Sequence, residues 1–352
     1  MLAQCIFFAR EVDRSLGASK QVAKPLGVGQ IGAMRLIIDT DTAGDDVFSL
    51  MLALTRPGVQ LEAITIAHGN VGFEQHAENA LVTLERCGRA GEVPVYLGAQ
   101  FPLMRTPLDA AYVFGRDGMS DRGFAKTAQR PADGHAVDEL VRRIMAAPGE
   151  ITVIAQAPLT NIALAYQREP RIAKALKHLW VMGGTDNGVG NVTPAAEYNF
   201  YADPEAAKIV VNAGFNLSIA SWTLTLKDGL WTTAQLDALD ALGTDKARFF
   251  TDVNRASLAF ARETEALDGS LHPDALTCAI ALDESLILEA ETCVVDVETV
   301  GELTRGYLSV SHAILPDIEI ADPALKRRPP NALVIKSIDR EGFFAAMKAA
   351  LL

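Results

Sequence analysis

Short apolar runs alternate with longer stretches of mixed polarity along most of this chain. Runs of the kind that form buried strands occupy residues 36–38, 60–67, 94–97, 150–155, 178–182 and 216–220. Stretches predicted to be helices lie between them at 47–54, 74–87 and 162–167. Because strands that alternate with helices form parallel sheets, the pattern predicts an α/β fold with an open, mainly parallel, Rossmann-like sheet flanked by helices.

The rest of the chain indicates a single domain. Further helices and strands are predicted at 233–241, 246–266, 275–282, 293–297, 307–310, 332–338 and from Arg340. No internal repeat and no Pro/Gly/Ser-rich linker divides residues 34–352. Residues 1–33 resemble a signal peptide only poorly, since no basic residue precedes their apolar stretch and charged residues interrupt it. We expect them to form a flexible N-terminal extension.

The strongest chemical signal directly follows the first predicted strand. Asp39, Asp41, Asp45 and Asp46 place four carboxylates within eight residues. Like charges this close repel one another, and a hard cation with a preference for carboxylate oxygens, such as Ca²⁺, would relieve that repulsion. In open α/β sheets, ligands bind beyond the carboxyl ends of the strands. The turn therefore predicts a metal site at that edge.

Composition limits the kinds of molecule that we expect the protein to bind. The chain has 352 residues, is 49% hydrophobic and carries a formal net charge of -12. Such acidity argues against binding nucleic acid polymers or anionic membranes, and favours a small substrate. Its four cysteines have no paired spacing, which suits the reducing cytoplasm. No apolar run reaches the roughly 18 residues of a membrane span.

Several blocks resemble one enzyme family. Residues 39–46 resemble the Asp-x-Asp-Pro-Gly-x-Asp-Asp signature of inosine-uridine-preferring nucleoside hydrolases, with Thr-Ala-Gly in place of Pro-Gly-x. Residues 156–161 resemble its Gly-Pro-Leu-Thr-Asn segment. Residues 180–184 with 197–200, and then 271–276, resemble its Met-Gly-Gly, Glu-x-Asn and His-Asp-Pro blocks. The resemblance extends from residue 36 to about 283 and implies the nucleoside hydrolase fold.

The resemblance implies a reaction and its metal. It assigns Ca²⁺ to Asp41, Asp46, Asp274 and the main-chain carbonyl of Gln156. The expected reaction is hydrolysis of the N-glycosidic bond of a ribonucleoside to ribose and free base, with Asp41 activating a metal-bound water. Such enzymes are commonly homodimers or homotetramers, and their substrate is a small molecule.

The resemblance also implies a ribose pocket. Its members are Asp45, Asn70, Met182, Asn191, Glu197, Tyr198 and Asn199. Sugar hydroxyls need acceptors such as carboxylates and amphoteric groups such as amides, which this set provides. Asn199 is also expected to stabilise positive charge on the ribose as the bond breaks. Asn70 remains open to a second interpretation, because Gly-Asn also forms plain turns.

The group that activates the leaving base is left open. His272 is the first candidate and Tyr198 the second, although Pro273 separates His272 from Asp274 where the family has His and Asp adjacent. Phe114 lies in a predicted long loop at 98–134 and either stacks on a nucleobase or covers a small core. His68 is either an indirect part of the site or a satisfied buried histidine. Base preference stays undetermined.

Two other functions fit parts of the sequence. A calcium-dependent nucleoside- or ribose-binding protein without turnover fits the departures on the leaving-group side. A haloacid-dehalogenase-type phosphatase fits Asp39-Thr40-Asp41, which resembles that family's Asp-x-Asp opening. That family requires Thr or Val at the position of Ala43 and has no need of the Asp45-Asp46 pair.

Overall fold

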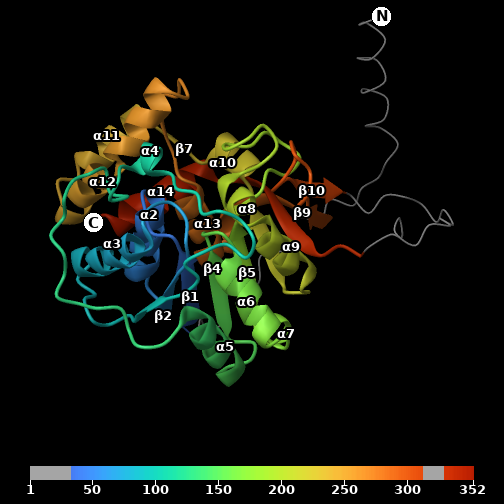
Figure 1. Ribbon diagram of the computed structural model, residues 1–352. Coiled ribbons are helices and arrows are strands. Elements are labelled where there is room, and N and C mark those ends of the chain that lie inside the picture. The colour runs from blue at the N-terminus through green and yellow to red at the C-terminus, as the bar shows by residue number, and fades with distance from the viewer. Residues whose placement is uncertain (1–32, 312–328) are drawn as a thin grey trace, which may run out of the picture. The chain divides into compact units, whose positions relative to one another are not determined.

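Among the residues that the structure describes, a nine-stranded sheet forms the centre (Figure 1). The computed structural model describes residues 33–311 and 329–352, which belong to one compact unit, so all of the predicted extension except Ala33 lies outside the described residues. The strand order is β10-β9-β11-β6-β5-β4-β1-β2-β3. The parallel strands are β1 (Met34–Thr40), β2 (Val59–Ile66), β3 (Val95–Leu97), β4 (Ile151–Ala155), β5 (His178–Met182), β6 (Leu217–Ala220) and β11 (Ala332–Ile338).

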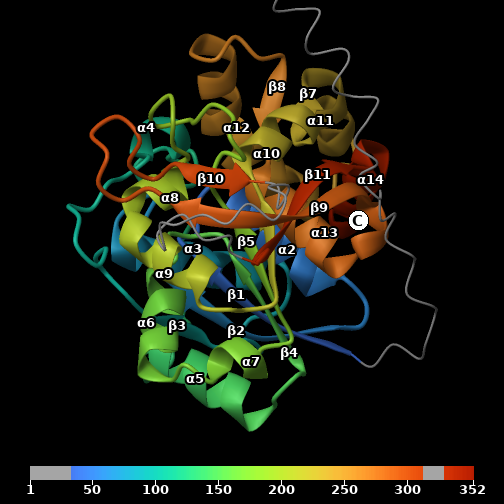
Figure 2. The same ribbon diagram turned by 90° about the vertical axis from the view of Figure 1, so that its right-hand side faces the viewer.

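Two antiparallel strands complete the sheet at one side, β9 (Ile287–Val297) and β10 (Leu308–Ser311), as Figure 2 shows. A separate two-stranded sheet pairs β7 (Leu230–Thr232) with β8 (Gly269–Leu271). The predicted open, mainly parallel α/β sheet is therefore confirmed.

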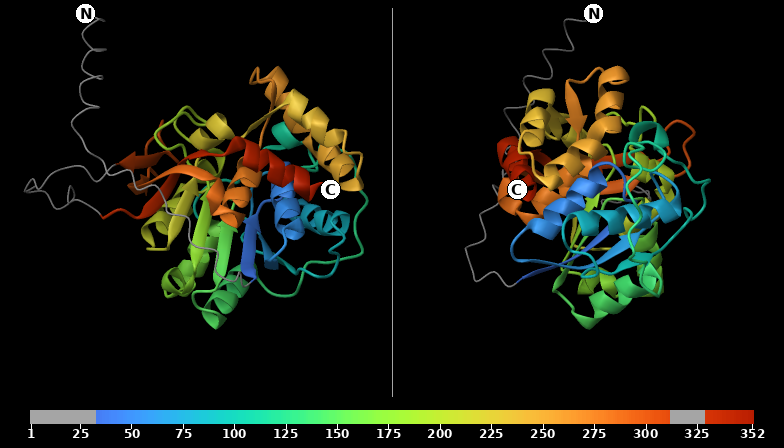
Figure 3. Two further views of the ribbon diagram at one scale, coloured as in Figure 1. Left: turned by 180° about the vertical axis from the view of Figure 1, so that it is seen from behind. Right: turned by 90° about the vertical axis from the view of Figure 1, so that its left-hand side faces the viewer.

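Helices cover both faces because the strands bury side chains alternately. Leu36 and Ile38 belong to one apolar cluster, whereas Ile37 belongs to the other. The first face carries α2 (Asp45–Thr55), α3 (Phe73–Arg86), α12 (Asp245–Glu263), α13 (Pro273–Leu282) and α14 (Arg340–Ala350). The second carries α5 (Ala136–Ala146), α6 (Thr160–Arg168), α7 (Ile172–Ala175) and α9 (Pro204–Asn212). Seen from behind in Figure 3, α2, α13 and α14 lie together on the first face.

The remaining elements are short or lie beside the sheet. They are α4 (Ala111–Phe114), α8 (Tyr198–Ala202), α10 (Trp222–Asp228), α11 (Thr233–Asp240) and a 3-10 turn at Glu284–Leu286. In Figures 1 and 2, α11 and α12 lie at one end of the sheet and α5 and α7 at the other. No helix in the described ranges is long and apolar enough to cross a membrane.

The structure confirms one predicted loop and contains a helix that the sequence did not predict. The long loop at 98–134 is confirmed, with α4 as its one regular turn. The sequence interpretation missed α5, although Val137, Leu140 and Ile144 are buried at helical spacing. No side chain caps α6, because its N-cap residue is the apolar Leu159.

Candidate active site

The three aspartates predicted to bind metal and Asp45, which is predicted to bind ribose, come together at the carboxyl ends of the strands. Asp41, Asp45 and Asp46 lie in and after the β1–α2 turn, while Asp274 lies in the first turn of α13. All four are buried, with at most 6% of any residue exposed. The main-chain N–H of Asp274 donates to Asp45 Oδ2 over 2.7 Å. Packing of α13 on α2 thus joins two segments that the sequence separates widely.

Asp46 is the most firmly held of these carboxylates. Its Oδ1 accepts hydrogen bonds from Thr40 Oγ1 at 2.6 Å and Gln156 Nε2 at 3.1 Å. Its Oδ2 accepts from the main-chain N–H of Ala43 and the side chain of Asn70. These bonds fix the end of β1 against β4 and the segment after β2, so Asp46 has little freedom to turn.

Asp41 and Asp274 each keep one oxygen free of hydrogen bonds. Asp41 Oδ2 accepts from the main-chain N–H of Asn70 at 2.8 Å, whereas its Oδ1 has no partner. Asp274 Oδ1 also has none. Buried polar atoms are seldom left unpaired, and oxygen atoms are the ligands of hard cations. The free oxygens fit a cation.

These carboxylates do not form a finished metal cage on their own. Within 33–311 and 329–352, no three His, Cys, Asp or Glu side chains converge as a ready set of metal ligands. A hard cation takes six to eight oxygens, main-chain carbonyls and waters among them. A cation held here would therefore need such oxygens beside Asp41 and Asp274.

Burial makes ionisation of the cluster costly. It raises the pKa of Asp45 to about 7, and the nearby charge of Asp46 adds to the effect. Burial raises the pKa of Asp46 to about 6. The pKa values of Asp41 and Asp274 also lie well above their ordinary range, first through burial and then through neighbouring aspartates. A bound cation would favour the ionised forms.

Asp39 lies in β1 and is held by side chains of β2 and α6. Its Oδ1 accepts hydrogen bonds from Thr65 Oγ1 at 2.6 Å and Asn161 Nδ2 at 2.8 Å. The residue is fully buried, and burial raises its pKa to about 7. A nucleophilic first aspartate of a phosphatase needs access to its substrate. This environment gives no support to the phosphatase alternative.

Hydrogen bonds join a second group of predicted site residues, Gln156, Met182, Glu197 and Asn199. The Asn199 amide donates to the main-chain oxygens of Gln156 at 3.1 Å and Met182 at 3.3 Å. Glu197 caps α8, accepting from the N–H groups of Asn199 and Phe200, and burial raises its pKa to about 7. The Gln156 carbonyl assigned to the metal thus also anchors the Asn199 side chain.

The other predicted ribose and base contacts also stabilise loops. Asn191 Oδ1 accepts from the main-chain N–H of Tyr198 at 2.9 Å. The Tyr198 hydroxyl donates to the carbonyl of Leu108 at 3.0 Å. Asn70 contacts Asp41 and Asp46 through its main chain and side chain. Of this group, Asn70 lies directly beside the acids.

The long loop lies over the acidic turn. The N–H of Gly44, at a φ of 46°, donates to the carbonyl of Gly118 at 2.8 Å. A Cβ atom on Gly44 would lie 2.3 Å from the half-buried ring of Phe114. Only glycine leaves room for that ring and readily adopts this backbone conformation. The contact of Phe114 with the turn was not foreseen, and its role in base stacking stays a prediction.

His272 lies in an aromatic cluster. It is fully buried, its Nε2 pairs with Ser270 Oγ at 2.8 Å, and its ring lies 4.2 Å from that of Trp231. Phe48 and Phe250 also contact the ring. Burial lowers the pKa of His272 to about 3, so the imidazole is neutral at pH 7. The structure therefore gives no support to proton donation by His272, which stays a prediction.

Sequence analysis missed several supporting residues. Ser49 Oγ donates to Gln156 Oε1 at 2.7 Å, which orients that amide toward Asp46. Asn161 binds Asp39 and the carbonyl of Ile66. A hydroxyl on the otherwise apolar helix at 47–54 was the available signal for Ser49. The partner of Asn161 had no local signal, because β1 and α6 meet only in the folded chain.

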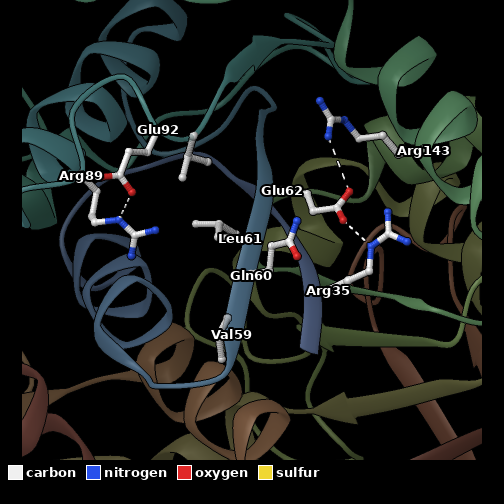
Figure 4. A pocket seen from close by; sticks show the side chains of 9 residues that line it. Arg35, Val59, Gln60, Leu61, Glu62, Arg89, Glu92 and Arg143 are labelled. Carbon is white, nitrogen blue, oxygen red and sulfur yellow. Dashed lines mark hydrogen bonds and ion pairs between the residues drawn. The ribbon is translucent and has the colours of Figure 1, made fainter. Parts of the chain in front are cut away.

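A cavity of about 500 Å³ lies elsewhere, where β1 and β2 begin (Figure 4). Arg35, Glu62 and Arg143 lie along one side of it. Glu62 pairs with both arginines, and Arg35 also pairs with Glu150 at 2.5 Å. The charged groups thus already have partners, and none of the predicted site residues lines this cavity.

Comparison with known proteins agrees with the arrangement at the carboxyl edge. The family described as inosine-uridine preferring nucleoside hydrolase matches residues 36–345. The chain belongs to that family. Among its nucleoside hydrolase relatives, the pyrimidine-specific ribonucleoside hydrolase RihA of Salmonella arizonae is 31% identical over 312 residues, which cover 88% of this chain and 96% of the relative.

Solved nucleoside hydrolases share the fold. A plant nucleoside hydrolase, PpNRh1, has a TM-score of 0.85 and 30% identity, covering 91% of this chain and 99% of its own. A purine-preferring ribonucleoside hydrolase from Gardnerella vaginalis has a TM-score of 0.80 and 26% identity, covering 90% and 98%. The chain is thus an enzyme of the nucleoside hydrolase class, whose members use a metal ion.

Proposed function

We propose that this nucleoside hydrolase cleaves the N-glycosidic bond of a ribonucleoside in a Ca²⁺-dependent reaction, giving ribose and free base. The observation that carries the proposal is the pair of unpartnered oxygens, Asp41 Oδ1 and Asp274 Oδ1, within a buried group of acids. We assign the ion to Asp41, Asp46, Asp274 and the carbonyl of Gln156. When bound, Ca²⁺ supplies positive charge that acidifies water and orients ribose hydroxyls.

We assign the other steps of the reaction to individual side chains. Asp41 takes the proton of the attacking water, since its Oδ1 has no other partner. Asn199 is held by the carbonyls of Gln156 and Met182, and we assign its amide oxygen to the positive charge that develops on the ribose. Asp45, Asn70 and Glu197 bind the sugar hydroxyls. The burial of these groups excludes bulk water.

A direct assay tests the proposal. Ribose release is measured with inosine, adenosine, guanosine, uridine and cytidine, with and without a calcium chelator. We expect release that the chelator abolishes and added Ca²⁺ restores, whereas Mg²⁺ at the same concentration restores less. The absence of release from folded, calcium-loaded protein would contradict hydrolysis of these nucleosides.

A second candidate is nucleoside binding without turnover. The observation in its favour is the leaving-group side, where His272 is neutral and buried and the Tyr198 hydroxyl already donates to Leu108. Saturable binding of a nucleoside, measured by calorimetry, without any released ribose would support this candidate. Turnover of the same nucleoside would exclude it.

We also propose a cytoplasmic homodimer or homotetramer. Cys87, Cys278 and Cys293 are free thiols among the described residues, which suits a reducing compartment. Assembly is proposed on the family resemblance. Light scattering coupled to size-exclusion chromatography measures the mass in solution, and a monomer at micromolar concentration would contradict the proposal.

A further inference from the structure

The segment His68-Gly69-Asn70 follows β2 and lies against the Asp41 carboxylate. The main-chain N–H of Asn70 donates to Asp41 Oδ2 at 2.8 Å. The Asn70 side chain donates to Asp46 Oδ2 at 3.3 Å. The preceding residue, Ala67, donates its N–H to the carbonyl of Thr40 at 3.1 Å. The segment is thus bonded to the acidic turn at several points, and one oxygen of Asp41 is committed to it.

Gly69 leaves the space that the Asp41 carboxylate occupies. A Cβ atom at Gly69 would lie 1.8 Å from Asp41 Oδ2 and 2.7 Å from Asp41 Cβ. Gly69 does not have a left-handed backbone, so its conformation does not itself require glycine. The requirement is one of space, because any side chain at residue 69 would displace the Asp41 carboxylate.

His68 ties the same segment to the body of the fold. Its main-chain N–H donates to the carbonyl of Ala99 at 2.8 Å, and its Nε2 lies 2.9 Å from Thr160 Oγ1. The Thr160 hydroxyl donates its proton to Asp203 Oδ2 at 2.6 Å. Because a hydroxyl has one proton, His68 Nε2 must be the donor to Thr160. A buried hydrogen-bonded chain therefore runs from α9 through α6 to the segment beside Asp41.

We propose that His68-Gly69-Asn70 is a positioning segment for Asp41. The Asn70 N–H engages Oδ2, Gly69 provides the space, and His68 fixes the backbone through Thr160 and Asp203. Asp41 Oδ1 is thereby left free, which is the oxygen that our mechanism assigns to water and Ca²⁺. This inference rests on the proposed function. It assigns roles to Gly69 and Thr160 that the sequence did not indicate, and it takes for His68 the indirect site role, one of the two interpretations that the sequence left open.

The first test compares Gly69→Ala with Gly72→Ala. Gly72 lies in the same loop, with a φ of -60° and open space around its Cβ position, so it is a matched control. A displacement of a reacting group by about 1 Å costs roughly 100-fold in rate. We expect Gly69→Ala to lose about 100-fold in kcat and at least tenfold in Ca²⁺ affinity, measured by calorimetry. Gly72→Ala should match the wild type in both.

A second pair of variants changes Thr160, which belongs to the hydrogen-bonded chain and not to the segment itself. Thr160→Val removes the hydroxyl at similar volume, whereas Thr160→Ser keeps it. We expect Thr160→Val to lower kcat about tenfold with KM nearly unchanged, since sugar contacts remain while Asp41 shifts. Thr160→Ser should restore most of kcat. Equal loss in both variants would overturn the role of the hydrogen-bonded chain.

The outcomes separate this inference from the proposed function. A folded Gly69→Ala protein that keeps kcat and Ca²⁺ affinity within threefold of wild type would overturn the positioning segment. If Gly69→Ala does not fold, the Thr160 pair decides. If the wild type releases no ribose but binds Ca²⁺, the proposed function fails, and the difference in Ca²⁺ affinity between Gly69→Ala and Gly72→Ala still decides the inference.

Discussion

The charged side chains at the two ends of the parallel strands differ in whether they form ion pairs. Where β1 and β2 begin, Glu62 pairs with Arg35 and Arg143 (Figure 4). Where β1 ends, none of Asp41, Asp45, Asp46 and Asp274 forms an ion pair with a basic side chain in the described ranges. One end is neutralised by its own side chains. The other is buried and acidic, which favours a cation from solution.

The difference separates stability from function. Paired charges at the strand starts restrain the fold and need no further partner. Unpaired buried acids destabilise the protein when no ligand is bound. Groups that destabilise the ligand-free fold in this way are typical of sites that bind a ligand. Variants at the two ends should therefore change different observables.

Asp41→Asn should have the largest effect, because it removes the proposed base and one charge from the acidic end. We expect kcat for ribose release to fall roughly 1,000-fold, within the range for loss of a general base. Thermal unfolding of the variant serves as the control for folding. A variant that keeps more than a tenth of the wild-type kcat would contradict the assignment of Asp41 as the base.

Removal of calcium should change stability in a pH-dependent way. Burial raises the folded-state pKa of Asp45 to about 7 and of Asp46 to about 6, so the ion-free protein takes up protons on folding and loses stability as pH rises from about 4 to 7. Ca²⁺ binds the ionised forms. The Tm difference between calcium-loaded and chelator-treated protein should therefore grow between pH 5 and pH 8. An equal difference at both pH values would contradict the assigned ion site.

His272→Gln tests whether His272 donates a proton to the leaving base. Since the ring of His272 packs against Trp231 and is neutral, we expect Tm to fall by several degrees and kcat to stay within about threefold of wild type. The change is measured with a purine and a pyrimidine nucleoside. A 100-fold loss of kcat at unchanged KM would instead restore His272 as the proton donor.

Glu62→Gln should have the smallest effect and should touch stability alone. It leaves Arg35 and Arg143 without their shared partner, and both remain close to solvent. We expect Tm to fall by a few degrees while kcat and KM match the wild type. Loss of activity comparable to that of Asp41→Asn would show that the two ends are coupled.

The sequence alone determined the features that depend on neighbouring residues. The apolar runs predicted the strands and the parallel sheet, because strands with buried faces are recognisable within a few residues. The spacing of Asp41, Asp45 and Asp46 marked the acidic turn for the same reason. Resemblance placed Asp274 with them, although nothing in its own neighbourhood indicated that its N–H would bind Asp45.

Only the tertiary structure decided which distant partners each side chain met. Thr160 and Asn161 stand at the start of α6, where capping residues are common, yet they donate to Asp203 and Asp39, because a buried acid left without a donor costs free energy. His272 lies two residues before Asp274, but pairing of β7 with β8 places Trp231 against its ring. The space left by Gly69 acquires meaning only when β1 and β2 lie side by side. Local pattern fixes the elements, and packing fixes the environments that set pKa values and hydrogen bonds.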